Sequence, residues 1–212
     1  MNTKIKMALG LAFTALTFSA NAQKKYTEGI ITSSVNVMGQ PVEAKTYFTT
    51  DSTAIAFQAG PAAVRILSSN KGDFMATLVD VPIASKKFAA VATPAEVEEN
   101  LSKIPTFTFA PTTETKVING FNCKKVVATD AKANKTYDFW VTNDISIPPS
   151  PMSKIYNGAG GFPIQYYSFR DGQAAQVSVK SITEGKAPAG TFAIQKDFEK
   201  ITMEQLDSMR HQ

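Results

Sequence analysis

The stretch NGFNCKKVVATDAKANKTYDFWVTND, residues 119–144, carries the pattern that decides the fold. Its first two residues, Asn119 and Gly120, favour a tight hairpin turn, because both central positions of such a turn need a positive φ angle. Apolar and polar residues then alternate over 123–129 and again over 136–142, on either side of the polar sequence DAKAN. Alternation with a period of two is typical of strands with one buried face, so the stretch predicts antiparallel strands.

The same alternation continues through most of the chain on both sides of this stretch. Further strands are predicted near residues 31–37, 42–48, 53–57, 64–67, 74–78, 107–109, 164–169 and 175–182, with a weaker one at the alanine-flanked Phe88. MGQP at 38–41 and Asp171-Gly172 mark two of the turns. The total is about ten strands, more than one short sheet holds without curling. We therefore expect a mainly β (α+β) fold, with a strongly curved antiparallel sheet or half-barrel.

One helix is expected to interrupt the strands in mid-chain. TPAEVEENLSKIP, residues 93–105, offers Thr93 as N-cap, Pro94 at the first helical position and Glu96 to complete a capping box. An apolar stripe at helical spacing follows, made of Val97, Leu101 and Ile104. Such a stripe predicts a helix that lies against the sheet or closes one end of it.

Two other segments depart from the strand pattern. SIPPSPMSKIYNGAGGFP, residues 146–163, holds four prolines and three glycines, which predicts a long surface loop without regular structure. A loop of this length in a compact domain is often functional or mobile. Near the end of the chain, Phe192, Ile194 and Phe198 are expected to pack on the body. A short C-terminal helix capped by Thr202 and Gln205 should follow.

The first 22 residues have the three-part layout of a secretory signal. Lys4 and Lys6 precede an apolar run over 7–18, and Ala20-Asn21-Ala22 offers a small-residue cleavage site. The apolar run is too short to span a bilayer. We expect residues 1–22 to be cleaved, a mature chain that starts at Gln23, no transmembrane segment in it, and a periplasmic or secreted location.

Charge and composition exclude several classes of protein. Removing residues 1–22 takes away two lysines and no acid, so the formal net charge falls from +4 to +2. The basic residues are scattered, without an arginine cluster or a basic stripe, so nucleic-acid binding is not expected. Residues 23–212 suit a single domain with a sizeable core.

The chain offers little reactive chemistry. It has one cysteine, Cys123, and one histidine, His211, next to its last residue, so neither a Cys-His site nor a metal site is expected. Cys123 follows Phe121 on one strand face, which favours a buried packing role over a reactive thiol. An acid pair such as Asp138 and Asp144 is more simply explained as a charged strand face. We expect no enzyme activity, no catalytic residue and no cofactor.

The chain also resembles a group of known proteins. Residues 113–144, with 161–169 and 192–200, resemble exported proteins of unknown function from the Bacteroidota lineage. In those proteins an I-x-G-[YF]-x-C-K turn precedes a W-x-T strand and a G-x-P strand. The matching residues here are Ile118, Gly120, Phe121, Cys123, Lys124, Trp140, Thr142, Gly161 and Pro163. The likeness covers residues 25–198 in layout and 118–169 in motif.

Those proteins are similar in strand and helix order to the lipoprotein carriers LolA and LolB, in which a curved sheet wraps a hydrophobic cavity closed by helices. The resemblance implies a LolA-like domain over 23–212 that binds a lipid or acyl chain in its concave face. The chain has fourteen phenylalanines. The candidate lining residues are Phe48, Phe57, Phe74, Phe88, Phe107, Phe109, Tyr137, Phe139 and Tyr166 from the sheet, with Val97 and Leu101 from the helix.

A second hypothesis needs no cavity. In it the same aromatic residues fill a solid core, and the protein is a structural or protein–protein interaction module of the cell envelope. The loop over 146–163 would then contact a protein partner. No motif in the sequence identifies a lipoprotein-binding site, so the two hypotheses both stay open at this point.

Overall fold

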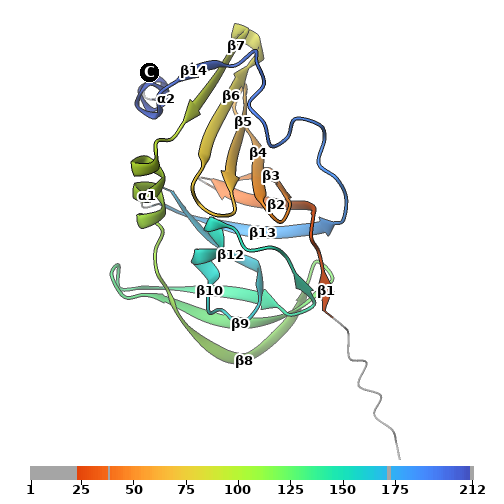
Figure 1. The fold of residues 1–212 in the computed structure, drawn as a ribbon. Coiled ribbons are helices and arrows are strands. Elements are labelled where there is room, and N and C mark those ends of the chain that lie inside the picture. The colour runs from red at the N-terminus through yellow and green to blue at the C-terminus, as the bar shows by residue number, and fades with distance from the viewer. Residues whose placement is uncertain (1–22, 38, 171–172, 211–212) are drawn as a thin grey trace, which may run out of the picture.

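The computed structural model describes residues 23–37, 39–170 and 173–210 (Figure 1). The expected signal peptide, the turn residues Met38, Asp171 and Gly172, and His211 lie outside these ranges. The fold is mainly β, as predicted. Its strands are β1 (Lys24–Lys25), β2 (Gly29–Val37), β3 (Gln40–Phe48), β4 (Ser52–Ala59), β5 (Ala62–Ser69), β6 (Met75–Val81), β7 (Lys86–Val91), β8 (Thr108–Ile118), β9 (Phe121–Asp130), β10 (Lys135–Thr142), β11 (Ile145–Ser146), β12 (Phe162–Arg170), β13 (Gln173–Thr183) and β14 (Glu199–Ile201). Its helices are α1 (Pro94–Ser102), α2 (Met203–Arg210) and the 3-10 helices η1 (Pro82–Ala84) and η2 (Pro151–Tyr156).

One large sheet dominates the structure. It has twelve strands in the order β14-β7-β6-β5-β4-β3-β2-β13-β12-β10-β9-β8, so β14 and β8 are its open edges. In Figure 1 the strands from β8 to β13 run across the lower part of the molecule, and β4 to β7 rise from it. The two remaining strands, β1 and β11, pair with each other in parallel.

The sheet is not antiparallel throughout, which corrects the expectation. β14 runs parallel to β7, with Ile201 opposite Ala90. The other neighbouring strands of this sheet pair antiparallel. The exception arises because a long C-terminal segment, residues 184–198, leaves β13 and crosses to the far edge of the sheet before β14 begins (Figure 1). We call this segment the tail.

The predicted central hairpin is confirmed. Asn119 and Gly120 have φ angles of 50° and 86°, and they join β8 to β9 with Ile118 opposite Phe121. The next turn closes through Asp130, whose carboxylate accepts hydrogen bonds from the backbone N–H groups of Lys132 and Ala133, both at 3.0 Å. Local turn chemistry therefore fixes the register of β8, β9 and β10.

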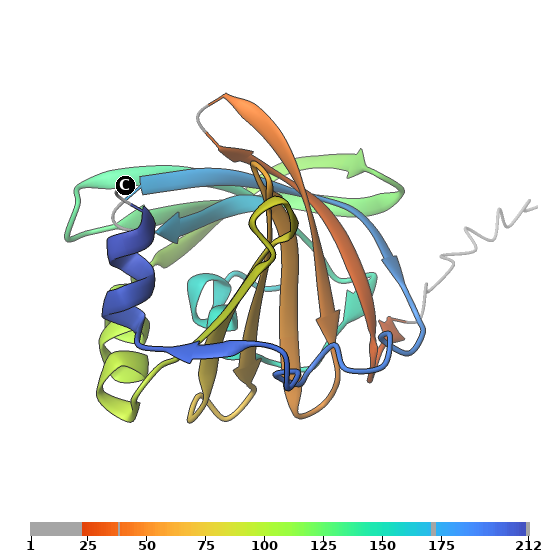
Figure 2. The same cartoon turned by 90° about the horizontal axis from the view of Figure 1, so that it is seen from above.

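Both predicted helices form, with the predicted caps. At α1, Glu96 N donates to Thr93 Oγ1 at 3.3 Å and Thr93 N donates to Glu96 Oε2 at 2.6 Å. At α2, Thr202 and Gln205 make the same reciprocal pair, at 2.8 and 3.1 Å. Figure 2 shows the two helices close together beside one end of the sheet, as Figure 1 does. In the described part of the chain, neither these nor any other helix is long and apolar enough to cross a membrane.

The Pro/Gly segment over 146–163 is not the irregular surface loop that its composition predicts. It contains η2, which Ser150 helps to start because Ser150 N donates to Ser153 Oγ at 2.8 Å. Ile155 and Ala159 are both buried against the sheet. Proline at the first turn of a helix needs no backbone N–H, so Pro151 promotes η2 where the composition suggested an irregular loop.

Candidate functional site

Strand register divides the sheet into two faces that continue from strand to strand, because opposite residues in neighbouring strands point the same way. We call one face the helix face, since η2 packs on it. Its row across β7, β6, β5, β4 and β3 is Phe88, Val79, Val64, Phe57 and Ala44. A row of the same face across β3, β2, β13 and β12 is Val42, Val35, Val177 and Tyr166. Tyr166 lies beside Tyr156 of η2, with ring centroids 6.3 Å apart.

The opposite face is the tail face, on which the tail packs. Its row across β3, β4, β5, β6 and β7 is Lys45, Ala56, Arg65, Leu78 and Ala89. Phe192, Ile194 and Phe198 of the tail pack on buried residues of this face, namely Ala54, Leu67, Ala76, Leu78 and Ala89. The small alanine side chains leave room for the larger tail residues above the strands.

Five of the predicted lining residues come together over the β8 to β12 half of the helix face. They are Phe107, Phe109, Tyr137, Phe139 and Tyr166. The ring centroid of Phe107 lies 5.8 Å from those of both Tyr137 and Phe139, and Phe139 lies 6.1 Å from Tyr166. Phe139 is 0% exposed. These separations are those of packed aromatic pairs, so in this half the rings contact one another under η2.

Burial also raises the pKa values of two tyrosines in this cluster. Burial raises the pKa of Tyr166 well above its ordinary value, with a smaller contribution from the neighbouring Tyr156. Burial likewise raises the pKa of Tyr156, although its hydroxyl lies 3.0 Å from Ser153 Oγ and this hydrogen bond acts in the opposite direction. Both phenols therefore stay neutral as part of the packed interior.

The β2 to β7 half of the helix face is different, because its apolar side chains are partly exposed. Among the described residues, these side chains belong to none of the three packed clusters of the structure. The set comprises Val35, Val42, Ile55, Phe57, Val64, Ile66, Val79 and Phe88. We call it the open apolar row. Of the predicted lining residues, Phe57 and Phe88 lie in it.

The remaining predicted lining residues are dispersed. Phe48 is buried in a cluster at β2 and β13, where its ring lies within 3.0 Å of the position that a Cβ on Gly29 would take. Phe74 is 36% exposed just before β6 begins. Val97 and Leu101 of α1 line a separate pocket of about 470 Å³ together with Gly72 and Lys154. They therefore do not meet the aromatic cluster in one cavity.

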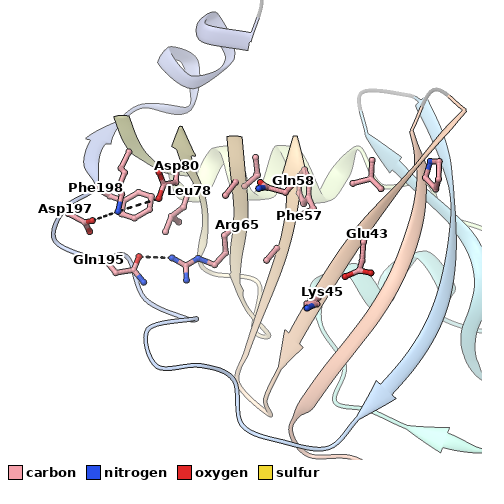
Figure 3. Close-up of a pocket in the computed structure, with 16 residues that line it drawn as sticks. Glu43, Lys45, Phe57, Gln58, Arg65, Leu78, Asp80, Gln195, Asp197 and Phe198 are labelled. Atoms are coloured by element: carbon pink, nitrogen blue, oxygen red, sulfur yellow. Dashed lines mark hydrogen bonds and ion pairs between the residues drawn. The ribbon is translucent and has the colours of Figure 1, made fainter. Parts of the chain in front are cut away.

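A larger groove lies on the tail face, between β3 to β7 and the tail (Figure 3). Its volume is about 810 Å³. Small side chains such as Ala56 and Ala63 form part of its floor, and the charged residues Glu43, Lys45, Arg65, Asp80, Lys87 and Asp197 surround it. None of these charged residues was predicted from the sequence as part of a site. Alternation along each strand predicts that these residues are exposed. It does not predict that they lie side by side, because the register that aligns them is set by the whole sheet.

Two basic side chains fasten the tail across this groove. Arg65 Nη1 donates to Gly190 O at 3.2 Å, and Arg65 Nη2 donates to Gln195 Oε1 at 2.7 Å. Lys87 Nζ lies 2.7 Å from Asp197 Oδ2 and 3.5 Å from Asp80 Oδ2 (Figure 3). The hydrogen bond to Asp197, with the charges of both acids, raises the pKa of Lys87, and the same contact lowers the pKa of Asp197.

The residues considered for catalysis are occupied by structural contacts. Cys123 is 2% exposed, and burial, with a further contribution from the charge of Asp144, raises its pKa to about 11. Asp138 lies 2.9 Å from Lys125 Nζ, and Asp144 Oδ2 accepts a hydrogen bond from Asn122 N at 2.7 Å. Within the ranges that the structure describes, no group of three or more potential metal ligands from His, Cys, Asp and Glu occurs.

Comparisons with known proteins add little to this geometry. No protein-family model matches the chain, and no curated protein matches it. A solved structure titled "Structure of PNGF-II in C2 space group" matches with a TM-score of 0.49 and 18% sequence identity. The match covers 86% of this chain and 32% of that chain, so this chain spans about a third of its length. A likeness of this degree carries no argument about function.

Proposed function

We propose that this chain is an exported protein that binds an apolar ligand, a lipid or acyl chain, on the helix face of β2 to β7. One observation carries the proposal: the open apolar row spans six neighbouring strands, and its side chains stay partly exposed outside the packed clusters. Covering such a row with a ligand removes apolar surface from water, worth about 0.8 kcal/mol for each methylene buried.

The position of the helices supports this choice of face. A Cβ placed on Gly72 would lie 3.6 Å from both Leu101 of α1 and Pro151 of η2, so these two helices approach each other at the turn between β5 and β6. In Figure 3, α1 is seen behind the strands, on the side away from the tail-face groove. We propose that the sheet curves around this side as a half-barrel and that α1 lies over the end of the open apolar row.

This arrangement is the one that the resemblance to LolA and LolB implies, with an apolar ligand between a curved sheet and its helices. The same proposal includes a cleaved signal peptide over 1–22 and a place in the periplasm or outside the cell. The aromatic cluster has a supporting role in it. Phe107, Phe139 and Tyr166 hold the β8 to β12 half together, and Phe57 and its neighbours contact the ligand.

The alternative, a protein–protein interaction module, has weaker support. The two most exposed large apolar side chains of the described residues, Ile83 and Val117, are 82% and 69% exposed. Ile83 lies in η1 beside β7, whereas Val117 lies in β8 at the other edge of the strand order. They do not form the single apolar patch that marks a protein interface. The 146–163 segment, proposed as the contact loop, is instead held to the sheet by Ile155.

The proposal is tested by titrating the chain from Gln23 onward with the neutral fluorescent probe N-phenyl-1-naphthylamine. We expect saturable binding that Phe57→Asp weakens at least tenfold, because the new carboxylate would have to be covered by an apolar ligand. Gln58→Asp is the matched control, since Gln58 is the next residue of β4 and its side chain therefore points to the opposite face of the sheet. Absence of uptake, or equal effects of the two substitutions, would refute the proposal.

A further inference from the structure

Two basic side chains of the tail-face groove, Lys45 of β3 and Arg65 of β5, form no ion pair with any residue that the structure describes. The partners of Arg65 are a backbone carbonyl and the side-chain amide of Gln195, both of which are neutral. Lys87, at the other end of the groove, is by contrast neutralised by Asp80 and Asp197. Uncompensated positive charge therefore gathers at the Lys45 and Arg65 end.

Strand register brings these two cations onto one row. Lys45 is opposite Ala56, and Ala56 is opposite Arg65. Neighbouring strands lie about 4.8 Å apart, so the two basic residues leave the sheet roughly 10 Å from each other. Only the methyl group of Ala56 stands between them on this row. The tail holds the guanidinium of Arg65 on the side of Gln195, so Lys45 is the side chain that can turn toward a ligand bound between the two (Figure 3). Glu43, two residues before Lys45, is the acid nearest along this strand, and it leaves one net positive charge among the three groups.

Arg65 has N–H donors that remain available to a ligand. A guanidinium has five N–H donors in a planar fork that matches the two oxygens of a carboxylate. Two of these donors are used, one on each Nη atom. Their partners on the tail, Gly190 and Gln195, also hold the guanidinium in place at the wall of the groove. Fixing a donor group in advance lowers the entropy that a bound ligand must lose.

Away from these cations the groove has an apolar part, while Asp80, Lys87 and Asp197 pair with one another at its other end. Ala63 and Leu78 line it, and Phe198 of the tail closes it beside Lys87. Its volume of about 810 Å³ falls within the range of about 300–1,000 Å³ that is usual for small-molecule sites. We propose that this groove is a binding site for a small amphiphile with a carboxylate head group. The head group lies between Lys45 and Arg65, and the apolar body lies over Ala56 and Ala63.

The charged side chains of this site and the open apolar row point to opposite faces of the same strands. The two sites adjoin each other, because Val42, Phe57 and Val64 of the open apolar row also contribute to the lining of the groove. They also differ in chemistry, since the open apolar row contains no charged side chain and needs none. The groove should therefore distinguish ligands by the charge of their head group, whereas the helix face should not.

The experiment is a methyl NMR titration of the chain from Gln23 onward with octanoate, octanol and octylammonium, three straight-chain compounds of eight carbon atoms that differ in head group. We expect octanoate to shift the Ala56 and Ala63 methyl signals saturably, and the other two compounds to bind at least tenfold more weakly. Lys45→Gln and Arg65→Gln should each weaken octanoate binding about tenfold or more, because each removes a charge-assisted hydrogen bond. Lys132→Gln, in the exposed turn after β9, is the matched control and should have no effect.

Lys45→Gln is the decisive variant, because Lys45 makes no hydrogen bond to the described residues of the tail, whereas loss of Arg65 also loosens the tail. Equal binding of octanoate and octanol would overturn the proposal, and so would octanoate binding that Lys45→Gln leaves unchanged. Octanoate shifts confined to the Ile55 and Val79 methyl groups, which lie on the helix face and do not line the groove, would place the ligand on the helix face. That result would refute the groove site while supporting the proposed function.

Discussion

Lys87 Nζ lies 2.7 Å from Asp197 Oδ2, a contact between residues 110 positions apart in the chain. Lys87 also lies over the ring of Phe198, 5.7 Å from its centroid. The contact joins β7 to the tail, just before β14 pairs with β7. Docking of the tail and formation of β14 should therefore depend on the charge state of this pair.

The pH dependence of this contact follows from the two pKa shifts. Because the pKa of Asp197 is lowered, its contribution is present above the ordinary carboxyl pKa of 3.8 and is lost as the pH falls through the lower, folded value. Because the pKa of Lys87 is raised, its contribution is present below 10.5 and is lost as the pH rises through the higher, folded value. The tail should stay docked between these limits.

Aromatic NMR signals of Phe198, followed against pH, check this prediction. In the original chain they should move toward solvent-exposed values at low pH. In Asp197→Asn the acid-induced shift of the Phe198 signals should be smaller, because residue 197 no longer titrates. An identical acid transition in the two proteins would contradict the assignment to Lys87 and Asp197.

The alanine floor of the tail face makes a second prediction. Ala76→Leu should destabilise the fold by about 1–3 kcal/mol, because Ala76 is 0% exposed and a larger side chain would displace the packed tail. Urea denaturation measures the change in the free energy of unfolding. Ala63→Leu, on the same face but exposed, is the control and should change it by less than about 0.5 kcal/mol. Equal effects of the two substitutions on the free energy of unfolding would show that packing of the tail does not require small side chains beneath it.

The aromatic cluster makes a third prediction, about stability. Phe139→Ala should lower the free energy of unfolding by about 3–5 kcal/mol, because it removes the ring that contacts Phe107, Phe109 and Tyr166 at once. Phe74→Ala, at a partly exposed ring, should have a much smaller effect in the same urea titration. A small effect at Phe139 would mean that the cluster is loosely packed and that its residues are available to a ligand.

A fourth prediction concerns the reactivity of Cys123. Its pKa of about 11 keeps it protonated at any pH below its ordinary value of 9.0, and its side chain is buried. A thiol reagent at mildly alkaline pH should therefore label the native protein at least a hundredfold more slowly than the urea-unfolded chain. Since the raised pKa favours the neutral thiol, its contribution to stability should be lost as the pH rises through the folded value. Rapid native labelling would reopen a reactive role.

Local features of the structure could be predicted from the sequence, and long-range ones could not. Asn119-Gly120 and the Thr93 cap depend on residues within a few positions of each other, and both form as expected. The burial of Ile155 within a Pro/Gly-rich segment depends on strands far away in the chain. The same is true of the parallel pairing of β14 and of the tail contacts of Arg65.

The candidate site shows the same division. Composition indicated aromatic residues in abundance, but it did not tell the packed Phe139 from the partly exposed Phe57, because both alternate with polar neighbours in the same way. Register places both on the helix face, and the aromatic cluster differs from the open apolar row because η2 packs over the β8 to β12 half. A substitution at Phe139 would therefore test folding, whereas one at Phe57 tests binding.

The most direct test of the proposed function is native mass spectrometry, with lipid extraction, of the chain purified from the cell envelope without detergent. We predict a discrete added mass of lipid or acyl-chain size that is lost in Phe57→Asp and kept in Gln58→Asp, with both variants folded by circular dichroism. A bare mass for the original chain, together with no uptake of N-phenyl-1-naphthylamine, would contradict the claim that this sheet face holds an apolar ligand.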